Sequence, residues 1–319
     1  MTQQHSGTPD DDDGDGTDGA GSSEADASRA GLTIEQVSRM VDLPIPTIRS
    51  WERRYQLPAV SRTPGGHRRY RGEQVDVVRR MRDLVKEGTR AADAAAQVKA
   101  EEAASPTSLI EALLQGARAF QTETLGQVLD EGRHALGLGR MVDEVILPAL
   151  RLIGEEWQSG QTDVSHEHLA SNVIRAWLST VSQLQTSPVA SPPIVLSCGP
   201  RDDHTLGLEA LHALLLERGV PCRLLGARTP ADSLALAVRD TAAVAVVLVC
   251  HLAAGRQAAV DALRQRELAQ TRIYYAGGAF ASHQARQGVP GQYLGENLTQ
   301  ATEVIADGLA GSTAARPVG

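Results

Sequence analysis

The sequence predicts a multidomain chain of the α and α/β classes: a small helical domain, a helical bundle and a doubly wound parallel sheet. Its 319 residues are more than one domain usually holds. Helical periodicity runs through the first part of the chain and then gives way to short apolar runs that alternate with helices. Charge is also divided unevenly: residues 1–29 hold eight acids and one base, whereas residues 30–100 hold 14 bases and eight acids.

Residues 1–29 form an acidic segment rich in Asp, Gly and Ser. Such a segment has too few apolar side chains to offset the entropy lost on ordering, so we expect a disordered tail. Elsewhere the longest strongly apolar run, residues 244–250, is too short to span a bilayer, and the three cysteines fit neither a disulfide framework nor a CxxC metal site. We therefore expect a soluble, cytoplasmic protein with no membrane partner.

Residues 30–100 predict a winged helix-turn-helix domain, in which two helices are followed by a basic loop and further helices. The helices are expected at residues 32–40, 46–55, 72–87 and 90–99, with the loop at residues 62–70. Thr33 caps the first helix, whose apolar face includes Val37 and Met40. Pro46 suits the first position of the second helix, because proline already has the required backbone angle.

Seven arginines and a single acid, Glu52, occupy the stretch from Arg49 to Arg71. Arginine pairs with phosphates and with guanine edges, which makes the stretch a candidate DNA-binding surface; a merely solvated basic face is the alternative. The domain resembles the MerR family of transcriptional regulators through the segments Thr47-Ile-Arg-Ser-Trp-Glu-Arg-Arg-Tyr55 and Arg62-Thr-Pro-Gly-Gly-His-Arg-Arg-Tyr70.

The resemblance to the MerR family implies a recognition helix near residues 46–55 and a wing near residues 62–70. It also implies binding to double-stranded operator DNA as a dimer or tetramer. The DNA-binding residues that it implies are Thr47, Arg49, Trp51, Arg53, Arg54, Tyr55, Arg62, Gly66, His67, Arg68 and Tyr70. Trp51 has a second interpretation, since it is equally suited to close the small core of the domain.

Residues 106–187 predict a four-helix bundle, with breaks near Gly116, residues 137–139 and Gly160. Residues 192–312 alternate strands with helices, which predicts a doubly wound parallel sheet whose ligand lies at the carboxyl ends of the strands. The strands are expected at residues 194–197, 222–225, 244–250 and 272–276. The helices are expected at residues 206–218, 230–239, 256–267 and 298–309.

The segment Asp202-Asp-His-Thr-Leu-Gly207 follows the first predicted strand, at this expected ligand site. A histidine there can bind a metal through one ring nitrogen while a carboxylate orients the other. Taken alone, however, an ordinary loop histidine fits the same pattern.

Residues 106–312 resemble the cobalamin-binding module of corrinoid proteins, a helical bundle followed by a Rossmann-like domain. The resemblance rests on the Asp-x-His-x-x-Gly motif above, on Gly277-Gly278, and on Gly154-Glu-Glu-Trp157 with Val164-Ser-His-Glu-His168. It implies that His204 is the cobalt ligand. The other cofactor-binding residues that it implies are Trp157, Val164, Glu167, His168, Asp202, Gly207, Gly277 and Gly278.

Together, the two modules resemble the CarH/LitR type of adenosylcobalamin-dependent photoreceptor repressors. Two features depart from that type. Val249 and Ala253 stand where hydroxyl groups that contact the cobalamin tail are expected. Gln158 follows the bundle tryptophan, where light-switching members carry a histidine that takes the upper cobalt position after the adenosyl group is lost.

The leading hypothesis is a transcriptional regulator, expected to be a repressor, whose oligomeric state and operator binding follow adenosylcobalamin and respond to light. The alternative is a MerR-type regulator that no longer binds cobalamin and senses another ligand or protein; the missing hydroxyl groups favour it. Enzymes that share the corrinoid module need a substrate barrel of about 250 residues. The chain has no room for one, so we do not expect an enzyme.

Overall fold

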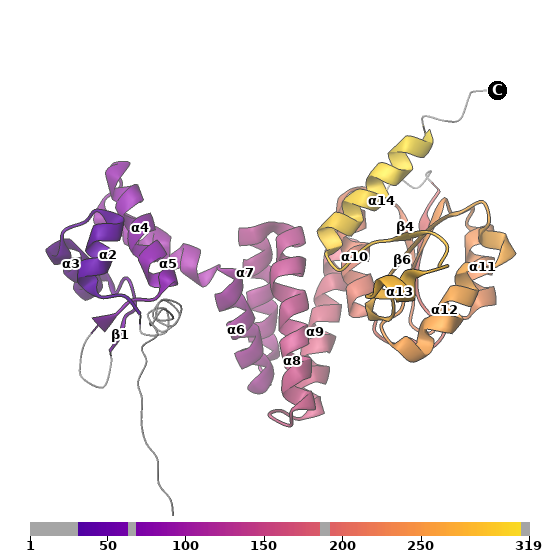
Figure 1. Cartoon of the computed structure of the whole chain (residues 1–319), viewed down its shortest axis with the longest axis horizontal. Helices are drawn as coiled ribbons and strands as arrows, with labels where there is room; N and C mark the ends of the chain where they lie inside the picture. The colour runs from indigo at the N-terminus through magenta and orange to yellow at the C-terminus, as the bar shows by residue number, and fades with distance from the viewer. Residues whose placement is uncertain (1–30, 63–67, 186–191, 314–319) are drawn as a thin grey trace, which may run out of the picture. The chain divides into compact units, whose positions relative to one another are not determined.

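The computed structural model describes residues 31–62, 68–185 and 192–313, and the expected acidic tail, Gly66 and His67 lie outside these residues. Contacts within the chain group it into two compact units that divide after Glu102 (Figure 1). Each unit is described by itself below. In the described part of the chain, no helix is both long enough and apolar enough to cross a membrane.

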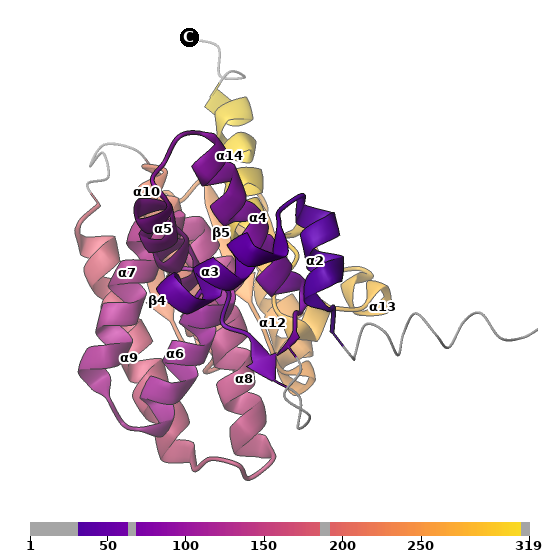
Figure 2. The ribbon, with the colours of Figure 1, turned by 90° about the vertical axis from the view of Figure 1, so that its left-hand side faces the viewer.

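Among its described residues, the first unit contains four helices and a short hairpin (Figure 2). Their bounds are α2 Ile34–Val41, α3 Ile45–Tyr55, β1 Ser61–Arg62, β2 Arg68–Arg69, α4 Gly72–Lys86 and α5 Ala91–Ala103. Thr33 caps α2 as expected, since its hydroxyl accepts a hydrogen bond from the backbone N–H of Gln36. The prediction for Met40 was wrong: its side chain is 53% exposed. Val41 is buried instead, because it lies four residues after Val37 and therefore on the same helix face.

The hairpin confirms that the basic loop returns on itself. Strands β1 and β2 pair in antiparallel fashion. Two backbone hydrogen bonds then join Tyr70 to Leu32, two residues before α2: Leu32 donates to Tyr70 over 2.7 Å and Tyr70 donates back over 2.9 Å. The base of the wing is thus attached to the segment that leads into the first helix of the unit.

The second unit begins with the expected bundle, whose four helices lie side by side in Figure 1. Their bounds are α6 Pro106–Arg118, α7 Thr122–Arg140, α8 Leu147–Gln158 and α9 Val164–Gln183, with a π-helical segment, η1 Met141–Ile146, between α7 and α8. The break expected near Gly116 follows this residue closely, since α6 ends at Arg118 and α7 begins at Thr122. Gly116 is buried inside α6, where an added Cβ would lie only 3.0 Å from the Leu125 side chain, so its role is close packing of α6 on α7. Gly137, with φ +77°, does interrupt the helical geometry of α7.

The rest of the second unit is the expected parallel sheet, with strand order β4-β3-β5-β6-β7 in the described residues. The strands are β3 Ile194–Cys198, β4 Cys222–Gly226, β5 Ala245–Val249, β6 Arg272–Ala276 and β7 Gln292–Tyr293. The helices are α10 Leu206–Glu217, α11 Ala231–Asp240, α12 Arg256–Leu263, α13 His283–Arg286 and α14 Leu298–Thr313. Helices α10 and α14 cover one face of the sheet and α11 and α12 the other (Figure 1). Strand β7 was not predicted, because two residues carry no strand periodicity.

Helix α10 joins the bundle to the sheet, because it contributes buried side chains to the apolar cluster of each. Ala210, Ala213 and Leu214 of α10 belong to the same buried cluster as the interior side chains of the bundle. Asp143 of η1 also accepts hydrogen bonds from the first two backbone N–H groups of α14, over 2.8 and 3.0 Å. This apolar and polar contact explains why the bundle, which the sequence suggests is a domain of its own, packs with the sheet as a single unit.

Candidate functional site

Asp202 lies at the centre of a polar cluster beside the carboxyl ends of β3 and β5. The loop after β3 turns back so that the backbone N–H of Asp202 donates to the Gly199 carbonyl over 3.0 Å. This turn leaves the side chain of Asp202 with no solvent exposure. A buried charge is costly unless hydrogen-bond donors surround it, so the partners of this carboxylate define the site.

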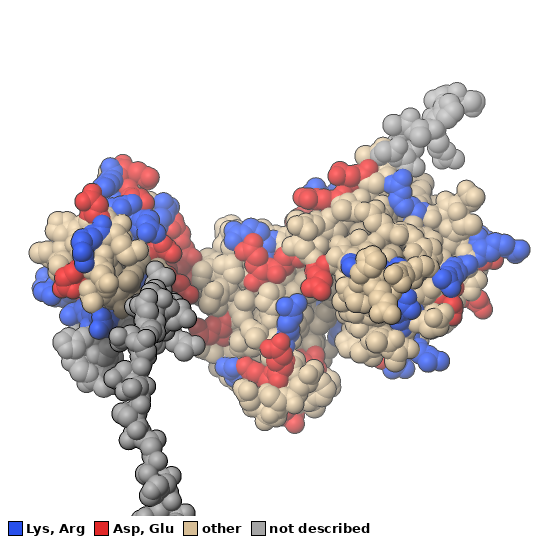
Figure 3. Space-filling view, in the orientation of Figure 1, with Lys and Arg blue, Asp and Glu red and all other residues tan. Residues whose placement is uncertain are grey.

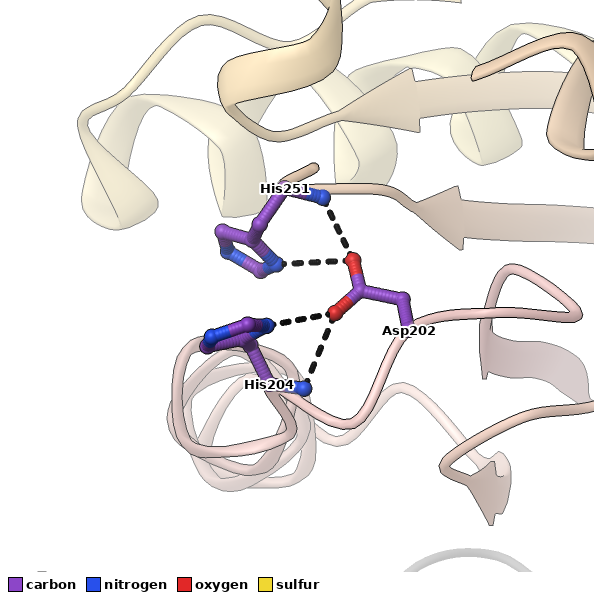
Figure 4. Close-up of side chains that lie close together, drawn as sticks. All are labelled: Asp202, His204 and His251. Atoms are coloured by element: carbon purple, nitrogen blue, oxygen red, sulfur yellow. Dashed lines mark hydrogen bonds and ion pairs between the residues drawn. The ribbon is translucent and has the colours of Figure 1, made fainter. Parts of the chain in front are cut away.

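Two histidines provide those donors. Oδ1 of Asp202 accepts from the backbone N–H of His204 over 2.9 Å and lies 2.8 Å from Nδ1 of the same residue. Oδ2 accepts from the backbone N–H of His251 and lies 3.1 Å from its Nδ1. Figure 4 shows both imidazole rings turned toward the carboxylate between them. The ring centroids are 5.3 Å apart.

The hydrogen bonds also set the charge of the cluster. Burial by itself would raise the pKa of the Asp202 carboxyl, because an ion is poorly solvated there. The hydrogen bonds from His251 and His204 outweigh burial and hold the pKa well below its usual value. The carboxylate is therefore ionised near neutral pH and engages Nδ1 of His204, which leaves Nε2 as the ring nitrogen available to a ligand.

His251 was not predicted as a site residue. It is the second residue after β5, and its neighbours Val249 and Ala253 drew attention only for the hydroxyl groups that they lack. The position of His251 just after a predicted strand was a usable signal, because the carboxyl ends of adjacent parallel strands meet at one edge of a sheet. Since β3 and β5 are adjacent, a polar residue just after β5 is expected to lie near the loop that carries Asp202.

A cavity of about 830 Å³ opens between the bundle and this edge of the sheet, with His204 and His251 in its wall. Its bundle wall comes from α8 and α9 and its other wall from the loop after β3, the start of α10 and the residue His251. Among the predicted cofactor residues, those lining it are Trp157, Glu167, His168, His204 and Gly207. Trp157 is 45% exposed, so this tryptophan is not a core residue of the bundle.

Two predicted residues line neither this cavity nor the smaller one described below: Asp202, which is buried behind His204, and Val164. Val164 is half-buried at the start of α9, one turn before Glu167. Glu167 is held in place, since it accepts a hydrogen bond from the Ser171 hydroxyl over 2.6 Å and lies 2.7 Å from Nδ1 of His168. The row of α9 residues that forms the wall therefore begins at Glu167, which corrects the expectation for Val164.

A second cavity of about 270 Å³ lies next to the first and shares Arg151, Gly207 and His251 with it. Gly277 and Gly278 line it, as does Val249, whereas Ala253 lines neither cavity. Gly277 has φ +100°, and a Cβ on it would lie 2.3 Å from the Cys250 carbonyl oxygen. Only glycine lets the chain pass so close to the backbone after β5.

In the first unit, the arginines of α3 face away from the core. Arg49, Arg53 and Arg54 are exposed, whereas Ile48 of the same helix is fully buried. Among the described residues, Arg53 and Arg54 take part in no ion pair, and blue side chains mark parts of the visible surface of this unit in Figure 3. Thr47 and Tyr55 are half-buried on the same helix. Unpaired arginines on an exposed helix face suit binding to a polyanion.

Two aromatic residues predicted to bind DNA are core residues instead. Trp51 is only 7% exposed and Tyr70 is not exposed at all. Both belong to the apolar core of this unit, which Trp51 enters from α3 and Tyr70 from the residue after β2. We therefore correct the expectation that either ring contacts DNA directly; Trp51 closes the core, as its second interpretation held.

Glu52 of α3 connects the recognition helix to the hairpin. It accepts a hydrogen bond from Nε of Arg68 over 2.9 Å and another from the Tyr70 hydroxyl. Burial raises the pKa of this hydroxyl, and the adjacent Glu52 carboxylate raises it further, so Tyr70 stays protonated and remains a donor. Arg68 thus fixes the wing on the helix. Of Arg62 only the backbone is described, in β1.

Comparison with known proteins identifies both regions. Residues 32–100 match the model of the MerR HTH family of regulatory proteins, and residues 107–181 match the B12 binding domain. The HTH-type transcriptional repressor CarH of Myxococcus xanthus is 32% identical over 272 residues, which are 79% of this chain and 90% of CarH. The repressor CarA of the same organism is 35% identical over 208 residues, 64% of this chain and 70% of CarA. The chain belongs to the CarH/CarA family of HTH-type transcriptional repressors.

Membership of this family confirms the resemblance and the fold class that the sequence predicted. Among solved structures, the monomethylamine corrinoid protein of Methanosarcina barkeri matches 62% of this chain and 95% of its own length, with a TM-score of 0.50. At 13% sequence identity this likeness establishes the fold alone. The cavity between the bundle and the sheet therefore lies in a fold of the corrinoid type, next to a region that matches a B12 binding domain.

The close approach at Gly277 leads to a prediction about stability. We expect Gly277→Ala to lower the free energy of unfolding by about 1–3 kcal/mol, because alanine is strained at this φ and its Cβ would collide with Cys250. Gly207→Ala is the matched control, since a Cβ there meets no atom within 4 Å and helix α10 tolerates alanine. Urea unfolding followed by circular dichroism compares the two. Equal losses would contradict the assigned role of Gly277.

Proposed function

We propose that this chain is a repressor that binds adenosylcobalamin in the large cavity and operator DNA through α3 and the hairpin. One observation carries the proposal: the His204 imidazole, oriented by the buried Asp202, stands in the wall of an 830 Å³ cavity. The match to the B12 binding domain and the similarity to CarH and CarA support it.

The residues present fit a corrinoid. Imidazole nitrogen is a good ligand for transition metals such as cobalt, and a carboxylate on the other ring nitrogen fixes the orientation of the ring. The two cavities share wall residues, so one elongated ligand can occupy both. Gly277 and Gly278 leave the smaller cavity without side chains on that wall, which suits a bulky group packed against the backbone.

Each wall of the cavity then has a role. His204 provides the metal ligand and Asp202 holds its ring. Gly277 and Gly278 would leave room for the nucleotide tail. Trp157 of α8 and Glu167 and His168 of α9 would cover the bound cofactor from the bundle. When bound, adenosylcobalamin supplies a cobalt–carbon bond that light can break.

In the first unit, Arg49, Arg53 and Arg54 provide the positive charge that meets the DNA backbone and base edges. Glu52 and Arg68 keep the wing in a fixed position relative to these arginines. We propose that the protein binds repeated half-sites as a homodimer or tetramer, because winged helix-turn-helix regulators commonly match operator symmetry with their own. Binding of cobalamin in the second unit would change this assembly.

The test is a mobility-shift titration with operator DNA, in the dark and after illumination, with and without adenosylcobalamin. Light scattering on the same samples reports the oligomeric state. If neither DNA binding nor assembly changes with the cofactor, the second unit senses another ligand or a protein, the alternative that Val249 in the wall of the smaller cavity favours. An enzymatic role is not proposed, since the relatives that the chain matches over most of their length carry the names of repressors.

A first prediction concerns the exposed arginines. Arg53→Ala should weaken DNA binding on all sequences and reduce the slope of log affinity against log salt by about one if Arg53 contacts a phosphate. Arg90→Ala is the control: Arg90 is 87% exposed just before α5, outside both the recognition helix and the hairpin. Fluorescence anisotropy over a salt series measures both variants. Unchanged affinity and slope for Arg53→Ala would remove Arg53 from the interface.

A second prediction concerns the metal ligand. His204→Ala should lose the imidazole-ligated absorption spectrum of bound cobalamin and release more of it on desalting. Because His204 is 57% exposed and its loss leaves no cavity in the core, the fold should persist. His134→Ala, on α7 and outside the cavity wall, is the control. The assignment fails if spectrum and retention are the same in the wild type and in His204→Ala.

A third prediction concerns Gln158, which lies in the cavity wall beside Trp157. The lone pair of an amide nitrogen is delocalised into the carbonyl, so Gln158 is a far poorer cobalt ligand than histidine. We expect the illuminated wild type to lack a stable two-imidazole spectrum and Gln158→His to gain one. His166 is an unsuitable replacement because its ring packs on Phe120, with centroids 4.3 Å apart, whereas His168 lines the cavity.

The control for this prediction is His168→Ala. A wild type that already shows the two-imidazole spectrum, and keeps it when His166 and His168 are replaced one at a time, would contradict the account of Gln158.

A further inference from the structure

The cluster of Asp202, His204 and His251 has the composition of a metal site in its own right. One ligand atom from each residue lies within 4.8 Å of the other two. The combination of two imidazoles and one carboxylate binds divalent transition metals in many proteins, and it leaves further positions for water. The Asp-x-His-x-x-Gly motif accounts for Asp202 and His204, but nothing in it requires a second histidine at position 251.

The distances between these atoms suit a single metal ion bound by all three residues. Metal–nitrogen and metal–oxygen bonds to zinc are about 2.0–2.2 Å long, so neighbouring ligand atoms around one ion lie roughly 3 Å apart. Here Nδ1 of His204 lies 2.8 Å from Oδ1 of Asp202, and Nδ1 of His251 lies 3.1 Å from Oδ2. Because one ligand atom of each residue lies within 4.8 Å of the other two, rotation of the rings can direct both nitrogens at one ion beside the carboxylate.

We propose that, in the cobalamin-free protein, Asp202, His204 and His251 bind one divalent transition-metal ion of the zinc type. The ion is held by Nδ1 of each histidine and by the Asp202 carboxylate. Each neutral imidazole then carries its proton on Nε2 instead of Nδ1, so binding requires a change of tautomer and no loss of a proton from the histidines. Water from the adjacent cavity completes the coordination.

The burial and accessibility of the three side chains favour binding of a metal ion. Asp202 is fully buried, and a cation beside its carboxyl group takes the place of the two ring N–H donors. The side chains of His204 and His251 are 57% and 34% exposed, so an ion reaches them from the large cavity without unfolding the loop. Asp202 itself is fixed by the two backbone N–H groups, which stay in place when the rings turn.

The ion and cobalamin should exclude each other. This step rests on the proposed function, in which His204 offers Nε2 to cobalt while its Nδ1–H donates to Asp202. An ion on Nδ1 removes that hydrogen bond and reverses the tautomer. Metal binding by the cobalamin-free chain is independent of this step.

The test uses the full chain, purified without cobalamin and without a polyhistidine tag, and titrated with Co²⁺ as a spectroscopic probe. We expect visible absorption bands that saturate at one equivalent and disappear when Zn²⁺ is added in excess. His251→Ala and His204→Ala should each weaken Co²⁺ binding at least tenfold, whereas His134→Ala should bind as the wild type does. Circular dichroism establishes that each variant is folded.

Two outcomes would overturn the proposal: a wild type that produces no Co²⁺ bands, or bands that persist unchanged in the folded His251→Ala variant. A separate measurement addresses competition, by adding adenosylcobalamin to the Zn²⁺-loaded protein and following released zinc with a chelating dye. If the protein binds cobalamin but releases no zinc, the two sites are compatible and the exclusion is wrong. If it binds zinc but no cobalamin, the proposed function fails while the metal site stands.

Discussion

The polar cluster of the second unit depends on the hydrogen bonds that the buried Asp202 carboxylate makes with His204 and His251. This carboxylate draws together the loop after β3 and the residue that follows β5, which are far apart in sequence, through four donors from His204 and His251. A charge with no solvent exposure is costly unless donors or a cation surround it. The same constraint that closes the sheet edge therefore also sets the tautomer and direction of two imidazoles in the cavity wall.

The cavity exists because two packing requirements meet. Helix α10 packs one side into the apolar cluster of the bundle and another into that of the sheet. Asp143 attaches the start of α14 to the bundle at another point. Polar residues of α9 and the loop after β3 face the cavity from opposite walls.

Sequence reasoning predicted the order of the helices and strands well, because each has strong periodicity, and it predicted His204 from the position of a motif after a strand. It failed for side chains whose burial depends on how separate segments pack together. Met40 lies just off the buried face of α2, and Tyr70, expected to contact DNA, is buried in the core of the first unit. His251 required knowing which strands are neighbours. The π-helical segment leaves no signal that local periodicity could detect.

A cavity with walls from two subdomains suits a regulator for a thermodynamic reason. A ligand shifts a conformational equilibrium only by the difference in its affinity for the two states. A ligand bound to the sheet edge alone would contact the same residues wherever the bundle lies, and would transmit nothing. A ligand that touches α8 and α9 as well as His204 loses contacts whenever these walls separate, so its presence, or a change in its chemistry, alters the energy of the whole unit.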